Sequence, residues 1–172
     1  MFVLGIDPGL SRCGYGCVEQ RGRAQRAVAA GVITTPPTQP VPQRLAELQR
    51  EVRSLLADLK PAVVAIERVL FQVNVRTAMS VGQAAGVVMA EAAAAGCDVV
   101  EYSPNEVKQA VAGWGAANKQ QMERMVQTLL GIDQPLRPVD AADAVALALC
   151  HLAQMPLGAR RTSAGAGNRS VR

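Results

Sequence analysis

The sequence predicts an α/β fold in which a mixed five-stranded sheet is flanked by helices, and three observations lead to this prediction. Short apolar runs of strand length recur along the chain, bounded by turn residues. The first three runs follow one another directly, whereas the later ones alternate with longer stretches of helical periodicity. A length of 172 residues, with 49% hydrophobic and 19% charged residues, suits one globular domain with a substantial core.

Three strands are expected at the start of the chain. Residues 2–7 form a short apolar run that Pro8-Gly9 stops, which places Asp7 at the carboxyl end of a buried strand. Residues 13–20 and 24–34 indicate two further strands. Together the three predict an antiparallel meander.

A helix and a strand should follow a proline-rich loop. Residues 43–59 place their leucines on one stripe, with Arg44 among the polar residues that lie mostly elsewhere, so we expect an amphipathic helix covering one face of the sheet. Pro42 stands just ahead of this helix. The next run, residues 62–66, is fully apolar, as expected for a central parallel strand, and Glu67 follows it immediately.

The remaining elements are four helices and one strand. Residues 75–95, rich in alanine, glycine and valine, predict a helix with small faces for close packing, part of which could be a dimer surface. Residues 97–102 indicate the fifth strand. Three further helices are expected at residues 104–111, 119–130 and 140–154. The order of three strands, helix, strand, helix, strand and helices is that of a ribonuclease-H-like fold.

Composition argues against a secreted or membrane protein. The apolar residues 1–6 are too few and lack the basic flank of a signal peptide. Charged residues interrupt the apolar stretches that come nearest to the length of a membrane span, namely Glu91, Asp140 and Asp143. We therefore expect a cytoplasmic protein that contacts no membrane.

The net charge of +4 gives no general argument for nucleic-acid binding, because it belongs to the end of the chain. Residues 157–172 hold four of the 18 lysines and arginines and no acid, so the other fourteen balance all 14 acids. A local cluster of bases, or a metal that neutralises clustered acids, would have to bind nucleic acid. We expect one ribonuclease-H-like domain at residues 1–156 and a disordered basic tail at 157–172.

The four cysteines indicate no metal site or disulfide framework. Cys13, Cys17, Cys97 and Cys150 show neither the paired short spacings of a zinc site nor the density of a disulfide scaffold. On one strand, Cys13 and Cys17 would be about 13 Å apart, beyond disulfide reach. We interpret all four as small buried hydrophobic residues.

Four acidic residues form the most informative pattern. Asp7 and Glu67 each follow a central strand, and Asp140 and Asp143, at positions i and i+3, face the same side of the last helix. Phosphodiester cleavage with two metals about 3.5 to 4 Å apart requires a short cluster of bridging acids, and oxygen ligands favour Mg²⁺ or Mn²⁺. Taken singly, Asp7 could be a turn residue and the helical pair could cap its helix.

His151, the only histidine, is not expected to join this cluster. At 1.5 Å rise per residue it lies about 12 Å along the helix from Asp143 and about 16 Å from Asp140, too far to share their metals. We favour an interaction with the C-terminus of its helix.

Several short motifs occur in a fixed order over residues 1 to about 155. They are Gly5-Ile6-Asp7-Pro8-Gly9, Gly14-Tyr15-Gly16, Ala65-Ile66-Glu67, Gly82-Gln83-Ala84, Val107-Lys108-Gln109 and Asp140-Ala141-Ala142-Asp143-Ala144. In order and spacing these blocks resemble the RuvC family of Holliday-junction resolvases. The first block alone would be a weak signal, whereas all of them in sequence are a strong one.

The resemblance implies a homodimer that binds one four-way DNA junction and nicks two strands of like polarity, leaving 5′-phosphate and 3′-hydroxyl ends. It implies two Mg²⁺ or Mn²⁺ ions at each active site and, as partners, the branch-migration proteins RuvA and RuvB. The residues that match the metal ligands of the family are Asp7, Glu67, Asp140 and Asp143.

The resemblance also implies further DNA contacts. Lys108 and Lys119 match basic positions near the DNA and the active site, where they would hold phosphate and, for Lys119, stabilise developing charge in catalysis. The loop after Glu67 would present an apolar wedge to the junction core. The family commonly has Phe three residues after this Glu, whereas here Leu70 stands there and Phe71 follows, so either could be the wedge. The loop residues expected to contact DNA are Leu70, Phe71, Asn74 and Arg76.

Three other functions are to be distinguished from junction resolution. The Gly-Ile-Asp-Pro-Gly motif also resembles the phosphate loop of actin-like ATPases and sugar kinases, but these need a second lobe for which 172 residues leave no room. A non-catalytic binder of branched DNA would be expected to lack one of the four acids, and all are present. Another ribonuclease-H-like nuclease, cutting RNA in hybrids, would differ in substrate rather than in ligands.

Overall fold

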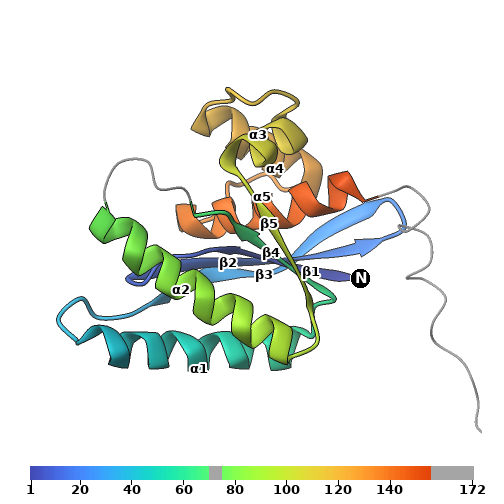
Figure 1. Cartoon of the computed structure of the whole chain (residues 1–172). Coiled ribbons are helices and arrows are strands. Elements are labelled where there is room, and N and C mark those ends of the chain that lie inside the picture. Colours follow the sequence, from blue (N-terminus) through green and yellow to red (C-terminus); the bar gives the residue numbers. More distant parts are fainter. Residues whose placement is uncertain (70–74, 156–172) are drawn as a thin grey trace, which may run out of the picture.

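The central sheet has its strands in the order β3-β2-β1-β4-β5 in the computed structural model, which describes residues 1–69 and 75–155 (Figure 1). β1 pairs antiparallel with β2, and β2 with β3, whereas β4 pairs parallel with both β1 and β5. The strand bounds are β1 Phe2–Asp7, β2 Arg12–Arg21, β3 Ala24–Thr34, β4 Val63–Glu67 and β5 Asp98–Tyr102. The predicted meander, the mixed five-stranded sheet and the α/β class are confirmed.

Helices cover both faces of this sheet. α1 and α2 pack on one face and α3, α4 and α5 lie on the other (Figure 1). Their bounds are α1 Val41–Leu59, α2 Val75–Ala94, α3 Pro104–Ala112, α4 Lys119–Leu130 and α5 Val139–Gln154. The predicted boundaries agree with these to within two residues at each end, and those of β1, β3 and α4 are identical. Pro42 lies inside the first turn of α1 rather than ahead of it, where a residue without a backbone N–H costs no helical hydrogen bond.

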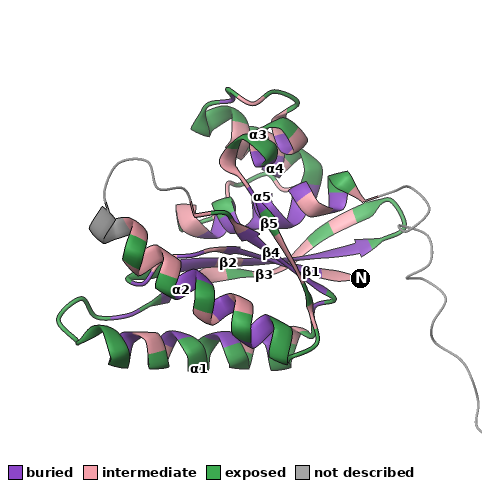
Figure 2. Cartoon of the chain, viewed as in Figure 1, coloured by how far each residue is buried: buried purple, intermediate pink, exposed green. Residues whose placement is uncertain are grey.

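Alternation along the central strands divides the core into two layers. On β1, Val3 packs on the side of α5, whereas Leu4 and Ile6 pack on the side of α1 and α2. α5 is buried along most of its length, as Figure 2 shows in purple, because its sequence is apolar on nearly every face. It is thus a central element of one layer rather than a surface helix.

α5 lies directly on backbone at three glycines of β1 and β2. A Cβ atom at Gly5 would come within 1.8 Å of the Ala144 carbonyl oxygen, and one at Gly14 within 2.2 Å of the Asp140 carbonyl oxygen. At Gly16 it would meet the Val145 side chain at 2.3 Å. The Gly14-Tyr15-Gly16 motif therefore has a physical role, since side chains at its two glycines would push the helix away from the sheet.

The leucine pattern of α1 predicted that Arg44 lies on the solvent face of the helix. In the structure its side chain is buried instead. Its Nε donates to Thr35 Oγ1 at 3.0 Å and its Nη2 to Ser11 Oγ at 2.5 Å. The Thr35 hydroxyl in turn donates to the Leu10 carbonyl at 2.5 Å. Arg44 therefore ties the segment before α1 to the turn between β1 and β2, which follows Asp7.

The cysteines behave as small hydrophobic residues. All four are free, with Cys13, Cys17 and Cys150 buried and Cys97 half-buried. The sequence-based interpretation is confirmed for the three buried thiols, whereas Cys97 is only half-buried and its Sγ donates to the Pro61 carbonyl at 3.2 Å. Among the described residues, moreover, no helix combines the length and apolarity that crossing a membrane requires.

Candidate active site

Asp7 and Glu67 lie next to each other because of strand parity and register. Asp7 ends β1 two residues after Gly5, so its side chain projects to the α5 face. Glu67 ends β4 two residues after Ala65, which packs in the same layer as α5. Since Ile6 pairs with Ile66 in a parallel ladder, the two carboxylates stand at neighbouring strand ends.

Asp140 and Asp143 reach the same place from α5. Gly14, the partner of Asp7 on β2, lies under the Asp140 backbone, so the start of the helix is held beside the end of β1. Asp143 follows one turn later on the same side of the helix. The N-cap of α5 is Pro138 and no side chain caps this helix, which argues against a capping role for either aspartate.

The electrostatics of the strand-end acids indicate a cluster of negative charge. Burial, followed by repulsion from Glu67, Asp143 and Asp140, raises the pKa of Asp7 to about 7, and Lys119 partly opposes this. Burial and the Asp143 charge also raise the pKa of Glu67. The four predicted carboxylates therefore lie close enough to influence one another.

Two basic residues neutralise the helical half of the cluster. Lys119 Nζ lies 3.7 Å from Asp143 Oδ2, and Arg12 donates from Nε (3.0 Å) and Nη2 (2.5 Å) to Asp140 Oδ2. Arg12 holds the pKa of Asp140 below its usual value, whereas burial raises the pKa of Asp143 in spite of Lys119. Among the side chains that the structure describes, those of residues 1–69 and 78–155, none donates a hydrogen bond to Asp7 or Glu67.

The residues present fit a hard metal cation. As the side chains stand, no group of three or more His, Cys, Asp or Glu residues in the described chain is gathered closely enough to hold an ion. As they stand, Asp140 is hydrogen-bonded to Arg12 and Asp143 lies against Lys119. A divalent cation would offset the repulsion that raises the pKa of Asp7, and carboxylate oxygens are the ligands that Mg²⁺ and Mn²⁺ prefer.

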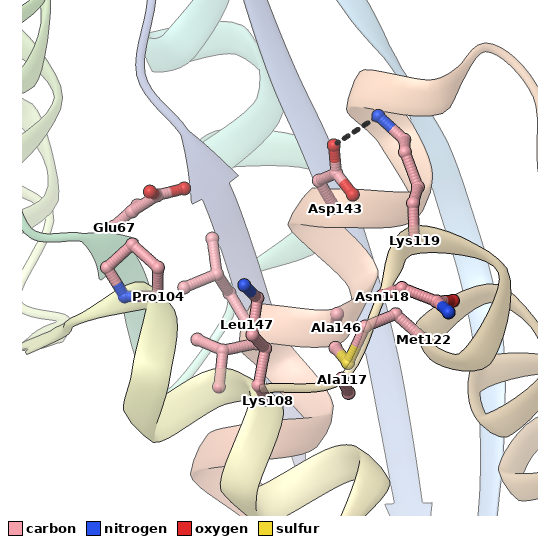
Figure 3. Close-up of a pocket in the computed structure, with 11 residues that line it drawn as sticks. Glu67, Pro104, Lys108, Ala117, Asn118, Lys119, Met122, Asp143, Ala146 and Leu147 are labelled. Atoms are coloured by element: carbon pink, nitrogen blue, oxygen red, sulfur yellow. Dashed lines mark ion pairs between the residues drawn. The ribbon is translucent and has the colours of Figure 1, made fainter. Parts of the chain in front are cut away.

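A pocket of about 280 Å³ adjoins the cluster (Figure 3). Glu67 lies on one side of it and Asp143 with Lys119 on the other, while Lys108 comes from α3 (Figure 3). Apart from Asn118, the rest of the lining is apolar: Pro104, Val107, Ala117, Met122, Ala146 and Leu147. The pocket thus joins acids and lysines to an apolar surface, and both predicted lysines lie at the site.

Local capping places these two lysines. α4 begins at Lys119 because Asn118 is its N-cap, with Oδ1 accepting from the Gln121 amide at 3.0 Å. Ser103 and Glu106 form the equivalent capping box of α3, which carries Lys108. Asn-x-x-Gln and Ser-x-x-Glu are therefore the sequence signals that position the basic side of the pocket.

His151 has a different partner from the one expected. Its Nδ1 lies 2.8 Å from the Tyr102 hydroxyl, and burial lowers the pKa of the imidazole. A neutral ring bonded to a side chain replaces the expected charge interaction with the helix C-terminus, because β5 brings Tyr102 against the last turn of α5. As predicted, it is not among the groups that perturb the carboxylate cluster.

Some predicted residues lie outside the described part of the chain. These are the loop residues Leu70, Phe71 and Asn74, the side chain of Arg76, and the basic tail at 157–172.

One residue of the site was missed in the sequence. Arg12 precedes Gly14 by two positions on β2 and so faces α5, a signal that becomes readable once β2 is known to pair with β1.

Comparisons with known proteins agree on one family. The family model described as crossover junction endodeoxyribonuclease RuvC matches residues 3–151. A protein of that name from Salinispora arenicola is 49% identical over 173 residues, covering 100% of this chain and 98% of the relative. Another from Syntrophomonas wolfei is 47% identical over 152 residues, covering 88% of each.

Solved structures give the same result. Thermus thermophilus RuvC superposes with a TM-score of 0.84 at 37% identity, covering 89% of this chain and 94% of that one. The T. thermophilus protein in complex with a Holliday junction substrate has a TM-score of 0.84 at 36% identity, covering 95% and 97%. The yeast mitochondrial Holliday junction resolvase shares the fold, with a TM-score of 0.65 at 16% identity over 94% of this chain and 82% of that chain.

Proposed function

The chain belongs to the family of the crossover junction endodeoxyribonuclease RuvC, and from this premise we propose how its own residues resolve a four-way DNA junction. It is an endonuclease of homologous recombination and DNA repair, and its substrate is the Holliday junction. The observation that carries the residue assignment is the convergence of acids from β1, β4 and α5 beside the pocket of Figure 3.

The four carboxylates are the proposed metal ligands. Nucleases of this family depend on a metal, and two Mg²⁺ or Mn²⁺ ions suit the all-oxygen donor set of Asp7, Glu67, Asp140 and Asp143. When bound, such ions activate water and neutralise charge that develops on the scissile phosphate. The strand-end acids supply fixed oxygens, and the acids of α5 supply oxygens that must first leave basic partners.

Lys119 and Lys108 have complementary proposed roles. Lys119, already 3.7 Å from Asp143, stands where charge develops at the phosphate and would stabilise it. Lys108 lines the same pocket from α3 and would hold the DNA backbone beside the site. Leu70 or Phe71 would be the wedge that opens the junction, with Asn74 and Arg76 as neighbouring DNA contacts.

Symmetric cutting requires two copies of this site, so we propose a homodimer that leaves 5′-phosphate and 3′-hydroxyl ends on two strands. An exposed face of α2 supports this assembly. A Cβ atom at Gly82 or Gly86 would meet nothing within 4 Å, and Met79 is 61% exposed. On family membership, RuvA and RuvB are the partners proposed to bring the junction to this dimer.

Two alternatives fit the site less well. If the protein only bound branched DNA, there would be no reason to bury Asp7 beside Glu67, where their charges repel each other. A nuclease for RNA/DNA hybrids could use the same ligands, but the family is defined by DNA junctions.

The decisive experiment is cleavage of a labelled mobile four-way junction, with linear duplex and RNA/DNA hybrid as control substrates. We expect paired nicks in the junction alone, with Mg²⁺, abolished by chelator and by Asp7→Asn while junction binding is retained. Binding without cleavage in either Mg²⁺ or Mn²⁺ would contradict the nuclease assignment. Preferential cutting of the hybrid would contradict the substrate.

A further inference from the structure

Arg12 makes the closest contact of any basic side chain with the carboxylate cluster in the described chain. Its Nε and Nη2 both donate to one oxygen, Oδ2 of Asp140, at 3.0 and 2.5 Å. The residues are 128 positions apart in the sequence. Their side chains are 52% and 32% exposed, so this pair lies at the open rim of the site.

The fold places this contact through backbone geometry. Arg12 precedes Gly14 by two residues on β2, so both residues are on the face of the sheet that α5 covers, and the Arg12 side chain projects toward this helix. Gly14 lies directly beneath the Asp140 backbone, which leaves the guanidinium within reach of that carboxylate. Gly9 allows the tight turn before Arg12, since a Cβ there would lie 2.2 Å from the Arg12 carbonyl oxygen.

A structural role does not account for the pair. Exposed ion pairs contribute little to folding stability, because solvent screens them and their side chains lose freedom. α5 is in any case held by its buried core and by its close approach to Gly5, Gly14 and Gly16. The Arg12–Asp140 contact therefore adds little to the attachment of this helix.

The pair bears instead on metal binding. Oδ2 of Asp140 accepts two N–H groups from the guanidinium and has little capacity left for a cation, so Arg12 leaves this carboxylate only Oδ1 to offer a metal while the pair is formed. A guanidinium beside Asp140 would also repel a divalent ion. We propose that Arg12 is an exchangeable partner of Asp140, which holds this carboxylate in the metal-free protein and gives it up when metal binds.

The inference rests on the proposed function, in which Asp140 is a metal ligand. Arg12 is then a positioning residue that acts through Asp140. It keeps the carboxylate charged and beside the site, and it lowers the metal affinity by the free energy of its own contact. Removing Arg12 should therefore strengthen metal binding, a direction that loss of a merely structural contact does not predict.

The test is a calorimetric titration of the metal-free full-length protein with Mn²⁺, without DNA. We expect Arg12→Ala to bind Mn²⁺ roughly threefold to fivefold more tightly than the control, the range expected for loss of an exposed competing pair. Arg12→Lys should fall between wild type and Arg12→Ala, because an ammonium lacks the fixed fork of donors. Thermal denaturation establishes that each variant is folded.

Arg137→Ala is the matched control. It removes the same charge from an exposed arginine–carboxylate pair, Arg137 with Glu123, whose side chains are 57% and 30% exposed. Neither residue is a proposed metal ligand, and the charge of Glu123 acts on Asp143, so this control also loses a positive charge near the cluster. The difference between Arg12→Ala and Arg137→Ala therefore isolates the effect on Asp140 from the general loss of a positive charge.

Asp140→Asn separates the two possible failures. If it weakens Mn²⁺ binding while Arg12→Ala binds no more tightly than Arg137→Ala, the exchange is wrong and the ligand assignment stands. If Asp140→Asn leaves Mn²⁺ binding unchanged, Asp140 is no ligand, and both the assignment and the exchange are overturned. A gain in Arg12→Ala that Asp140→Asn abolishes supports the proposal.

Discussion

The acids at the strand ends and the acids on α5 have different surroundings, although they form one cluster. Asp7 and Glu67 are half-buried, have a raised pKa, and receive no side-chain hydrogen bond within the described chain. Asp140 and Asp143 each lie against a basic side chain nearer the surface. The site therefore combines a fixed half at the strand ends, whose acids receive no hydrogen bond from a described side chain, with an adjustable half on α5, whose acids have basic partners even though burial raises the pKa of Asp143.

This difference shows how a cluster of acids can be tolerated in a folded protein. Four uncompensated carboxylates would repel one another strongly in a partly buried environment. Basic partners on the helical half reduce that repulsion, while the strand-end half keeps its oxygens in place. The following predictions test this division, beginning with the largest expected effect.

Removing one acid of the fixed half should nearly abolish cleavage. Asp7→Asn keeps the shape of the side chain and removes its charge, so we expect junction cleavage to fall by at least about 100-fold. Single-turnover cleavage with Mg²⁺ measures this, and a gel-shift assay should show junction binding retained. Arg137→Ala is the control and should cleave like wild type. Cleavage by Asp7→Asn within a few-fold of wild type would refute the role of this acid.

A substitution that pushes α5 away from the sheet should both displace Asp140 and Asp143 and lower the free energy of unfolding. In Gly14→Ala the new Cβ would lie 2.2 Å from the Asp140 carbonyl oxygen, so the helix must shift. We expect a loss of about 1–3 kcal/mol in the free energy of unfolding, as for other overpacked cores. Urea denaturation measures it. At Gly115 a Cβ would meet nothing nearer than 3.9 Å, so Gly115→Ala should change stability much less.

The two halves should respond oppositely to neutralisation in the absence of metal. Asp7→Asn removes repulsion and should raise the melting temperature of the metal-free protein, by roughly 2–4 °C for about 1 kcal/mol. Asp140→Asn removes a charge that Arg12 already compensates, so it should leave the melting temperature unchanged or slightly lower. Scanning calorimetry in chelator measures both. Equal shifts in the two variants would show that the halves do not differ in compensation.

The smallest effect concerns His151, which lies outside the cluster. Its pKa is lowered by burial, so at mildly acidic pH the unfolded chain takes up a proton that the folded protein does not. This contribution to stability is complete above pH 6.5 and is lost as the pH falls below 6.5 toward the lower folded pKa. The slope it adds is at most about 1.4 kcal/mol per pH unit.

His151→Gln should remove this slope. Urea denaturation at pH 7.5 and pH 5.5 would show a smaller loss of stability in the variant than in wild type. The carboxylates titrate in both proteins, so the comparison isolates the imidazole. Parallel pH profiles would indicate that His151 keeps an ordinary pKa in the folded chain.

The sequence was sufficient for features that depend on local pattern. Alternation and breakers defined the strands that end at Asp7 and Glu67, and helical spacing placed Asp140 and Asp143 on one side of α5. Because carboxyl ends of neighbouring parallel strands meet at one edge, the cluster could be predicted before the fold was known.

Other features depend on contacts between distant segments and could not be predicted in this way. The contact of Arg12 with Asp140 requires the strand order and the position of α5, neither of which has a local signal. Arg44 is buried against the hydroxyls of Ser11 and Thr35, which the polarity of an arginine does not suggest. His151 was assigned to its helix end because β5 and its Tyr102 could not be placed beside it.

The glycines beneath α5 have a consequence for how this enzyme can change over generations. Where a helix backbone touches strand backbone, the distance between them is set by peptide groups, whose dimensions do not vary from one homologue to another. Aliphatic residues deeper in the same layer can exchange size and shape while the origin of α5 stays in register with the end of β1. The position of the acids of α5 relative to Asp7 is thereby set by backbone contact at Gly5 and Gly14 rather than by the size of any side chain at these two positions.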